Sequence, residues 1–192
     1  MSFSTELKEE LSKTENLTNK EALKYELFGY LISSNISEES NKIKFATESE
    51  YNINRFARLL SNNNINKYDI GIQGKIFVIK VSKKDILSIN SENKELDENQ
   101  KKWLIKGAYL GAGSINNPEK KYHLEIGISQ KNETEKLVKF LKDFDIKSNI
   151  IEKNKQYAIY IKDGEEISKF LALIGASKSV IKFEEIRVQR EM

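Results

Sequence analysis

The sequence predicts an α+β protein made of two copies of one unit, each a small antiparallel sheet with helices packed on one face. Two observations support this fold class. The order helix, strand, helix, hairpin, helix occurs twice, and apolar residues recur at a constant offset of 81 positions. The matched pairs are Phe56 with Leu137, Leu59 with Phe140, Leu60 with Leu141, Ile65 with Ile146, and Ile86 with Ile167. A single unduplicated domain with coincidental spacing is the alternative.

The first copy is expected within residues 1–90. Helices are predicted where apolar residues recur every three or four positions, and strands where they alternate with polar ones. The expected helices are Ser4–Lys13, Asn19–Ser34, Asn54–Asn63 and Lys83–Ile89, and the expected strands are Lys42–Glu48, Tyr68–Ile72 and Ile76–Val81. The polar stretch Ser88–Asp97 has no such pattern, so it is expected to connect the two copies.

The second copy is expected within residues 98–176. Its first helix aligns with that of the first copy at an offset of 78 (Gly29 with Gly107), because the loop NNPEKK lengthens the second copy. The expected helices are Asn99–Gly113, Thr134–Asp143 and Glu165–Ile174, and the expected strands are Tyr122–Ser129, Asn149–Glu152 and Tyr157–Lys162. Residues 177–192 are expected to form a further helix that has no stop signal and leads toward another domain.

Composition limits the function classes. The absence of cysteine excludes disulfides, thiolate zinc sites and cysteine nucleophiles. No apolar run approaches the roughly 18 residues of a membrane span, and the start does not resemble a signal peptide, so a cytoplasmic protein without a membrane partner is expected. The net charge of +3 permits contact with nucleic acid. Arginine is the residue that reads guanine, and only Arg55, Arg58, Arg187 and Arg190 are present, so backbone contacts are expected more than base reading.

A stripe of small residues marks the first helix of each copy. Gly29 and Ser33 are four positions apart, as are Gly107 and Gly111, so each pair shares one helix face. Because glycine lacks a Cβ atom, such faces let two backbones approach closely. We therefore expect these two helices to pack against each other along a pseudo-twofold axis, a role that needs no catalysis.

The residues around this stripe resemble two related families. The segment GAYLGAGS, from Gly107 to Ser114, resembles the G-L-F-D-A-D-G-S motif of LAGLIDADG homing endonucleases. MSFSTELKEEL, KGAYLGAGSINNPEKKYHLEI, FLALIGAS and KFEEIRVQRE are together similar to the WhiA family of bacterial sporulation and cell-division regulators, along almost the whole chain. That resemblance implies a homing-endonuclease-like fold followed by a C-terminal helix-turn-helix domain. It also implies a nucleoid-associated transcription regulator tied to cell division, chromosome segregation and sporulation.

The resemblance to nucleases indicates where catalytic acids would stand. In that family the last acid of each motif helix holds divalent metal at the twofold axis. The aligned positions here are Ser34 and Ala112, and neither side chain carries the carboxylate that a hard cation requires. We therefore expect no metal and no nuclease activity. Relocated acids remain an alternative; the candidates are Glu38, Glu39, Glu119 and Glu125.

Other catalytic chemistry is also not expected. The single histidine, His123, has no partners at the spacing of a Ser–His–Asp triad. GAGSIN follows a helix, whereas glycine-rich phosphate loops follow a strand and open a helix, so no nucleotide cofactor is expected.

Two hypotheses for function remain open. In the first, the open sheet face contacts DNA phosphates without reading much sequence; the candidate residues are Lys42, Lys44, Lys67, Lys75, His123 and Lys155. Acids on or near this face, namely Glu48, Asp69 and Glu125, weaken its positive field. In the second, the domain is a protein-interaction or regulatory scaffold that does not itself bind DNA, which the near-balanced charge favours.

Overall fold

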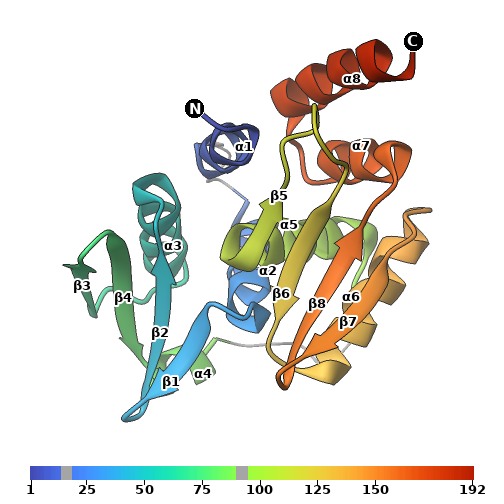
Figure 1. The fold of residues 1–192 in the computed structure, drawn as a ribbon. Helices are drawn as coiled ribbons and strands as arrows, with labels where there is room; N and C mark the ends of the chain where they lie inside the picture. The colour runs from blue at the N-terminus through green and yellow to red at the C-terminus, as the bar shows by residue number, and fades with distance from the viewer. Residues whose placement is uncertain (14–18, 90–94) are drawn as a thin grey trace.

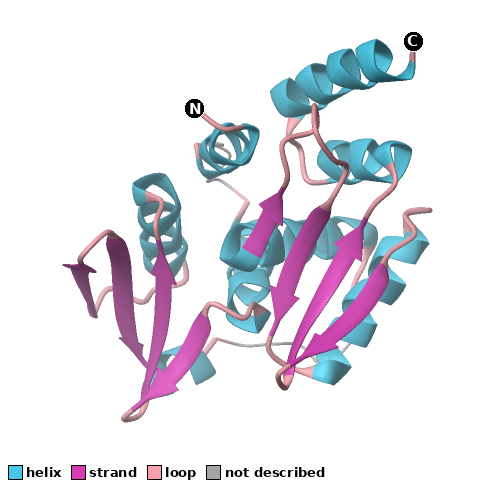
Figure 2. Cartoon of the chain, in the orientation of Figure 1, coloured by secondary structure: helices cyan, strands magenta, loops and turns pink. Residues whose placement is uncertain are grey.

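The computed structural model describes residues 1–13, 19–89 and 95–192, and it places two four-stranded sheets side by side with helices behind them (Figure 1 and Figure 2). Half of the predicted connector, residues 90–94, lies outside the described part. The helices are α1 (Phe3–Ser12), α2 (Lys20–Ile32), α3 (Glu50–Asn62), α4 (Lys83–Leu87), α5 (Glu98–Ala112), α6 (Lys131–Asp143), α7 (Gly164–Leu173) and α8 (Ser177–Glu191). The strands are β1 (Ile36–Glu39), β2 (Lys42–Thr47), β3 (Tyr68–Gln73), β4 (Ile76–Ser82), β5 (Gly113–Ile115), β6 (Leu124–Ile128), β7 (Asn149–Lys153) and β8 (Gln156–Ile161).

Both sheets have the same topology, which confirms the predicted duplication. The strand orders are β1-β2-β4-β3 and β5-β6-β8-β7, and the paired strands are antiparallel. Each sheet contains one strand that the sequence pattern did not predict, β1 in the first and β5 in the second. Both strands are short, and each follows directly on a motif helix, where the chain turns from helix into sheet.

Alternation along the inner strands puts one face of each sheet against the helices. Phe45 of β2 lies opposite Ile79 of β4, and both are fully buried. Ile126 of β6 and Ile159 of β8 form the corresponding pair in the second sheet. Full burial of one such side chain stabilises the fold by about 1.5–3 kcal/mol. These residues therefore fix which face of each sheet remains open.

The helices behind each sheet follow the 81-residue offset. Phe56 and Leu59 of α3 are fully buried, and Leu137 of α6 is equally covered, whereas Phe140 is only partly buried. Among the described residues, no helix is both long enough and apolar enough to cross a bilayer.

The first and last helices of the described chain are joined. The first residues of α8 have no side-chain cap of their own, and the carboxylate of Glu10 in α1 takes that role. It accepts hydrogen bonds from the backbone N–H of Lys178 at 2.9 Å and from that of Ser179 at 3.0 Å. An acidic group at a helix N-terminus satisfies unpaired N–H groups and interacts favourably with the helix dipole. The Phe3 and Phe183 rings, 6.1 Å apart, complete this contact.

Candidate functional site

The two motif helices, α2 and α5, pack backbone against backbone. A Cβ atom added to Gly29 would lie 2.2 Å from the carbonyl oxygen of Leu104. One added to Gly107 would lie 1.9 Å from the carbonyl oxygen of Glu26. These two contacts are reciprocal, because Glu26 and Leu104 each lie three positions before the glycine of their own helix. The structure therefore places the glycines where the sequence analysis expected them, at the pseudo-twofold contact.

A buried ionic cluster that the sequence pattern did not predict lies beside the glycines. The Glu26 carboxylate accepts hydrogen bonds from Arg55 Nε at 2.8 Å and from an Arg55 terminal nitrogen at 2.9 Å. Lys106 Nζ is 3.2 Å from the same carboxylate, and all three side chains are almost fully buried. Burial lowers the pKa of Lys106, and attraction to Glu26 opposes that shift. Because α2, α3 and α5 each contribute one member, the cluster connects the two halves.

Small side chains pack together at the C-terminal ends of the motif helices α2 and α5. A Cβ atom added to Gly127 of β6 would lie 2.2 Å from Ser34 Oγ and 3.6 Å from Ala112 Cβ, so these three residues meet. The Ser34 N–H donates to the carbonyl of Gly127 at 2.9 Å. The hydroxyl of Ser129 donates to the carbonyl of Ser33 at 2.9 Å. The end of α2 is thus hydrogen-bonded to the second sheet.

The acids that could stand in for the motif carboxylates do not converge. Glu38 pairs with Lys83 at 2.5 Å, and Glu39 is 3.6 Å from Lys80. Glu125 is 3.4 Å from His123, and Glu119 is exposed in the loop before β6. Within the described ranges, no group of three or more histidine, aspartate or glutamate side chains is arranged to hold a metal ion.

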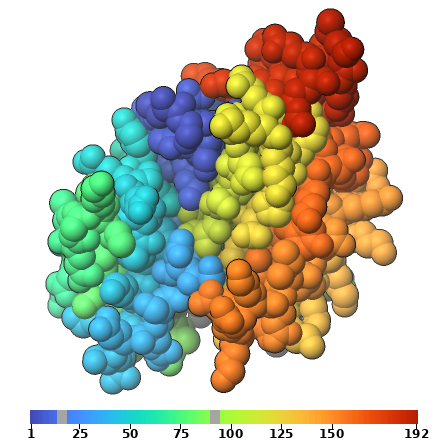
Figure 3. Space-filling model, viewed as in Figure 1, coloured from blue at the N-terminus to red at the C-terminus, as the bar shows by residue number. Residues whose placement is uncertain are grey.

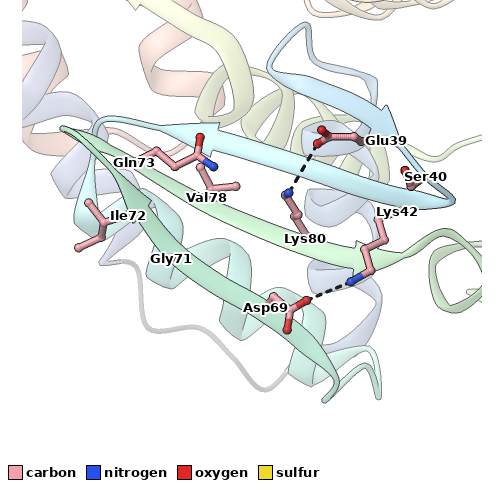
Figure 4. Close-up of a pocket in the computed structure, with 9 residues that line it drawn as sticks. All are labelled: Glu39, Ser40, Lys42, Asp69, Gly71, Ile72, Gln73, Val78 and Lys80. Atoms are coloured by element: carbon pink, nitrogen blue, oxygen red, sulfur yellow. Dashed lines mark hydrogen bonds and ion pairs between the residues drawn. The ribbon is translucent and has the colours of Figure 1, made fainter.

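The open face of the first sheet carries a row of lysines between two acids (Figure 4). Lys44 of β2 lies directly opposite Lys80 of β4, on the face away from Phe45 and Ile79. Asp69 of the edge strand β3 lies opposite Lys80, and Glu39 of the other edge strand, β1, lies opposite Lys42. Like charges placed directly opposite each other destabilise a sheet pair, so the Lys44–Lys80 pair favours an anionic partner.

The other predicted lysines lie at the margins of the sheets. Lys67 immediately precedes β3. Lys75 lies in the β3–β4 turn, and Lys155 lies in the β7–β8 turn with a φ of 64°. The structure therefore brings Lys42 and Lys44 together on an open face, whereas Lys75 and Lys155 project from hairpin ends. Lys80 was not among the predicted residues, but it lies on the same open face as Lys42 and Lys44. Its position two residues after Val78 on an alternating strand could have predicted this.

The open face of the second sheet is less basic. His123 precedes β6, and its ring stacks on that of Tyr160 with centroids 6.0 Å apart and an interplanar angle of 11°. Lys162 Nζ lies 4.9 Å from the Tyr160 ring centroid. The His123 side chain retains only 18% of its exposure, so it is packed and not freely solvated. Along β6 and β8 this face also carries Gly127 opposite Ala158.

No arginine lies on a strand of either sheet. Arg55 and Arg58 belong to α3, and Arg187 and Arg190 belong to α8. Arg55 forms the buried ion pair with Glu26, and Arg187 pairs with Glu184 at 2.9 Å. The side chains best suited to bidentate reading of guanine are therefore absent from the strands of both open faces.

Two sheets side by side in front of a glycine-packed helix pair define a protein of the LAGLIDADG homing-endonuclease-like fold class (Figure 1). In the space-filling view, the first half of the chain (blue to green) and the second half (yellow to red) lie side by side (Figure 3). A solved structure of the homing endonuclease I-DmoI superposes with a TM-score of 0.61 at 19% identity, covering 81% of this chain and 96% of that one. Within this class, the chain belongs to the WhiA family. Residues 101–192 match the model of the WhiA LAGLIDADG-like domain. Over its full length the chain is 32% identical to the probable cell division protein WhiA of Clostridium tetani, of which it covers 70%.

Further relatives agree with this assignment. The probable cell division protein WhiA of Caldicellulosiruptor saccharolyticus is 41% identical over 60% of this chain and 36% of its own length. Full-length DUF199/WhiA from Thermatoga maritima superposes over all of this chain and 68% of that one, with a TM-score of 0.83 and 25% identity. The N-terminal LAGLIDADG domain of DUF199/WhiA covers 91% of this chain and 92% of that domain, with a TM-score of 0.75 and 27% identity. The chain therefore spans about two thirds of a full-length relative.

Proposed function

We propose that this chain is a non-catalytic, DNA-binding domain of a cytoplasmic, nucleoid-associated transcription regulator that acts in cell division, chromosome segregation and sporulation. In this proposal a C-terminal helix-turn-helix domain provides the main sequence recognition, and the open sheet faces add contacts with the phosphate backbone. The absence of nuclease activity is part of the proposal, because Ser34 and Ala112 stand where the related nucleases carry metal-binding acids. Solved I-DmoI complexes with DNA support the choice of partner, since they contain the same fold with DNA bound.

One observation carries the DNA-binding proposal. Lys44 and Lys80 are direct cross-strand neighbours on an open face, and Lys42 lies on the same face two residues from Lys44. Closely spaced ammonium groups attract a polyanion and release its condensed counterions. Because no arginine accompanies them on the strands, we expect binding with little sequence preference. Lys67, Lys75, Lys155 and His123 are proposed as peripheral contacts only.

A salt titration of duplex binding tests this proposal. The 192-residue chain is titrated into a fluorescently labelled duplex of mixed sequence, and anisotropy is followed from about 50 to about 200 mM salt. Lys44→Gln with Lys80→Gln should weaken binding at every salt concentration. The same two substitutions should lower the slope of log K against log salt by about 2, because each lost phosphate contact removes about one released counterion.

A matched control distinguishes the effect of losing lysines on the sheet face from the effect of a lower overall charge. Lys131 and Lys139 are exposed on α6, in the helix layer behind the second sheet, and removing them changes the net charge by the same amount. Lys131→Gln with Lys139→Gln should leave the slope unchanged. Equal weakening by both double variants, or no duplex binding by the parent chain, would refute the proposed contact surface.

A second candidate function is a protein-interaction or regulatory scaffold that does not bind DNA. The observation in its favour is the exposed edge strand β3, where Ile70 is 55% exposed and Ile72 is 66% exposed. Exposed apolar side chains on an unpaired strand edge are a common feature of protein contact sites. The titration distinguishes the two functions, since a scaffold predicts no duplex binding by this chain at physiological salt.

A further inference from the structure

On the open face of the first sheet, two acids form ion pairs with two of the lysines proposed to contact DNA. Lys42 Nζ lies 3.1 Å from Asp69 Oδ2, and Lys80 Nζ lies 3.6 Å from Glu39 Oε2. Both ion pairs are diagonal, because each acid lies on an edge strand and reaches across one inner strand to its lysine. Figure 4 shows both pairs among the residues that line one pocket on this face. The lysines thus occupy the centre of the face, and the acids flank them.

These ion pairs are exposed to solvent, so another anion can replace the carboxylate at each lysine. The Asp69 side chain retains 76% of its exposure and the Glu39 side chain 57%. Exposed ion pairs of this kind contribute little to stability and are screened by salt. A phosphate group can therefore replace either carboxylate without a large structural change. Lys44 has no ion-pair partner among the described residues, so it offers the first contact.

We propose that Glu39 and Asp69 act as built-in competitors of the DNA backbone, which hold Lys80 and Lys42 in the free protein and thereby limit affinity for duplex phosphate. This inference rests on the proposed DNA-binding function and adds residues to its site. When DNA binds, each lysine exchanges a carboxylate for a phosphate. The released carboxylate then faces a strongly negative surface and takes up a cation from solution.

The exchange has a measurable signature in the salt dependence. Each phosphate contact releases about 0.9 counterion from B-DNA, and each freed carboxylate takes part of that release back. The parent chain should therefore show a shallower slope of log K against log salt than its number of lysine contacts predicts. Removing the acids should both tighten binding and steepen the slope.

The test uses Glu39→Gln with Asp69→Asn, substitutions that keep the shape of each side chain and remove its charge. We expect the affinity for a mixed-sequence duplex to rise about three- to tenfold at about 100 mM salt, and the slope to steepen by between about 1 and about 2. Glu135→Gln with Glu185→Gln is the control, because both residues are exposed on helices, α6 and α8, and the net charge changes equally. This control should move affinity and slope much less.

The outcomes separate this inference from the function on which it rests. If Lys44→Gln with Lys80→Gln weakens binding and removal of the two acids strengthens it, the DNA-binding face and the competition by the acids are both supported. If the lysine variant weakens binding while the acid variant matches its control, the competition is refuted and the DNA-binding face survives. If the lysine variant binds like the parent chain, or no protein binds duplex at low salt, both are refuted.

Discussion

Gly107→Ala tests the backbone contact between α2 and α5 with the addition of a single methyl group. The new Cβ would lie 1.9 Å from the carbonyl oxygen of Glu26 and 2.8 Å from its carbonyl carbon. Real Cβ atoms essentially never come within 3.0 Å of such an atom, so the helices must separate by about 1 Å at this point. The obstacle is backbone, and it cannot rotate away as a flexible side chain would.

The expected cost combines one favourable term with two unfavourable ones. Alanine is intrinsically better than glycine inside a helix by about 1 kcal/mol. Overpacking in a close-packed interior costs about 1–3 kcal/mol, and more where backbone must move. Separation also stretches the buried ion pair between Lys106 of α5 and Glu26 of α2. We therefore expect a net loss of about 2–4 kcal/mol in the free energy of unfolding, which lowers Tm by roughly 10 °C for a domain of this size.

Urea unfolding followed by circular dichroism measures this loss, and Gly71→Ala is the matched control. Gly71 lies on the edge strand β3, and a Cβ atom there would meet nothing within 4 Å. The control should change stability by no more than about 0.5 kcal/mol. If Gly107→Ala and Gly71→Ala had the same midpoint, the two motif helices could not be in the contact described, and the reasoning would fail.

Three further predictions concern the core and the helix ends. Glu26→Gln should destabilise the chain by about 3–5 kcal/mol in the same urea assay, because two buried cations lose their counterion; a loss below about 1 kcal/mol would contradict the buried cluster. Burial raises the pKa of Tyr109 well above its ordinary value, so its contribution to stability is complete below about pH 10 and is lost as the pH rises further. Tyr109→Phe should therefore lose less stability than the parent chain between about pH 9 and about pH 11, and equal losses would refute this linkage. Ser34→Asp with Ala112→Asp should not cleave a supercoiled plasmid in Mg²⁺ or Mn²⁺, because the side chain of Ser34 already packs against Gly127 and a larger aspartate would be crowded there; nicking above the parent level would contradict this.

Much of the fold followed from the sequence because apolar spacing reports burial directly. Phe56 and Leu137 share one position in the repeat, and both are buried behind their sheets. The short strands β1 and β5 carried no such signal. ISEE is exposed along nearly its whole length, and GSI has only three residues, so neither alternates over enough positions to be recognised.

The candidate site was less predictable, because charged residues look alike in a sequence whether they are buried or exposed. Glu26 lies three positions before Gly29, and Lys106 directly precedes Gly107, so both adjoin the small-residue stripe of a motif helix. A charge so near a glycine contact is a signal for a buried pair, although its partner Arg55 comes from another helix. The open face differs again: which lysine lies opposite which acid depends on strand register, and register is set by turns and core packing together.

The reciprocal glycine contacts have a consequence for how duplicated halves recognise each other. The backbone contact is symmetric, so geometry alone would allow either half to pair with a copy of itself. The side chains are not symmetric: Glu26 corresponds to Leu104, and Lys106 corresponds to Phe28. Two second halves would bury Lys106 without a carboxylate, and two first halves would bury Glu26 and Arg55 without the third member of the cluster. The buried charges thus specify a mixed pair, and neither half can substitute for the other.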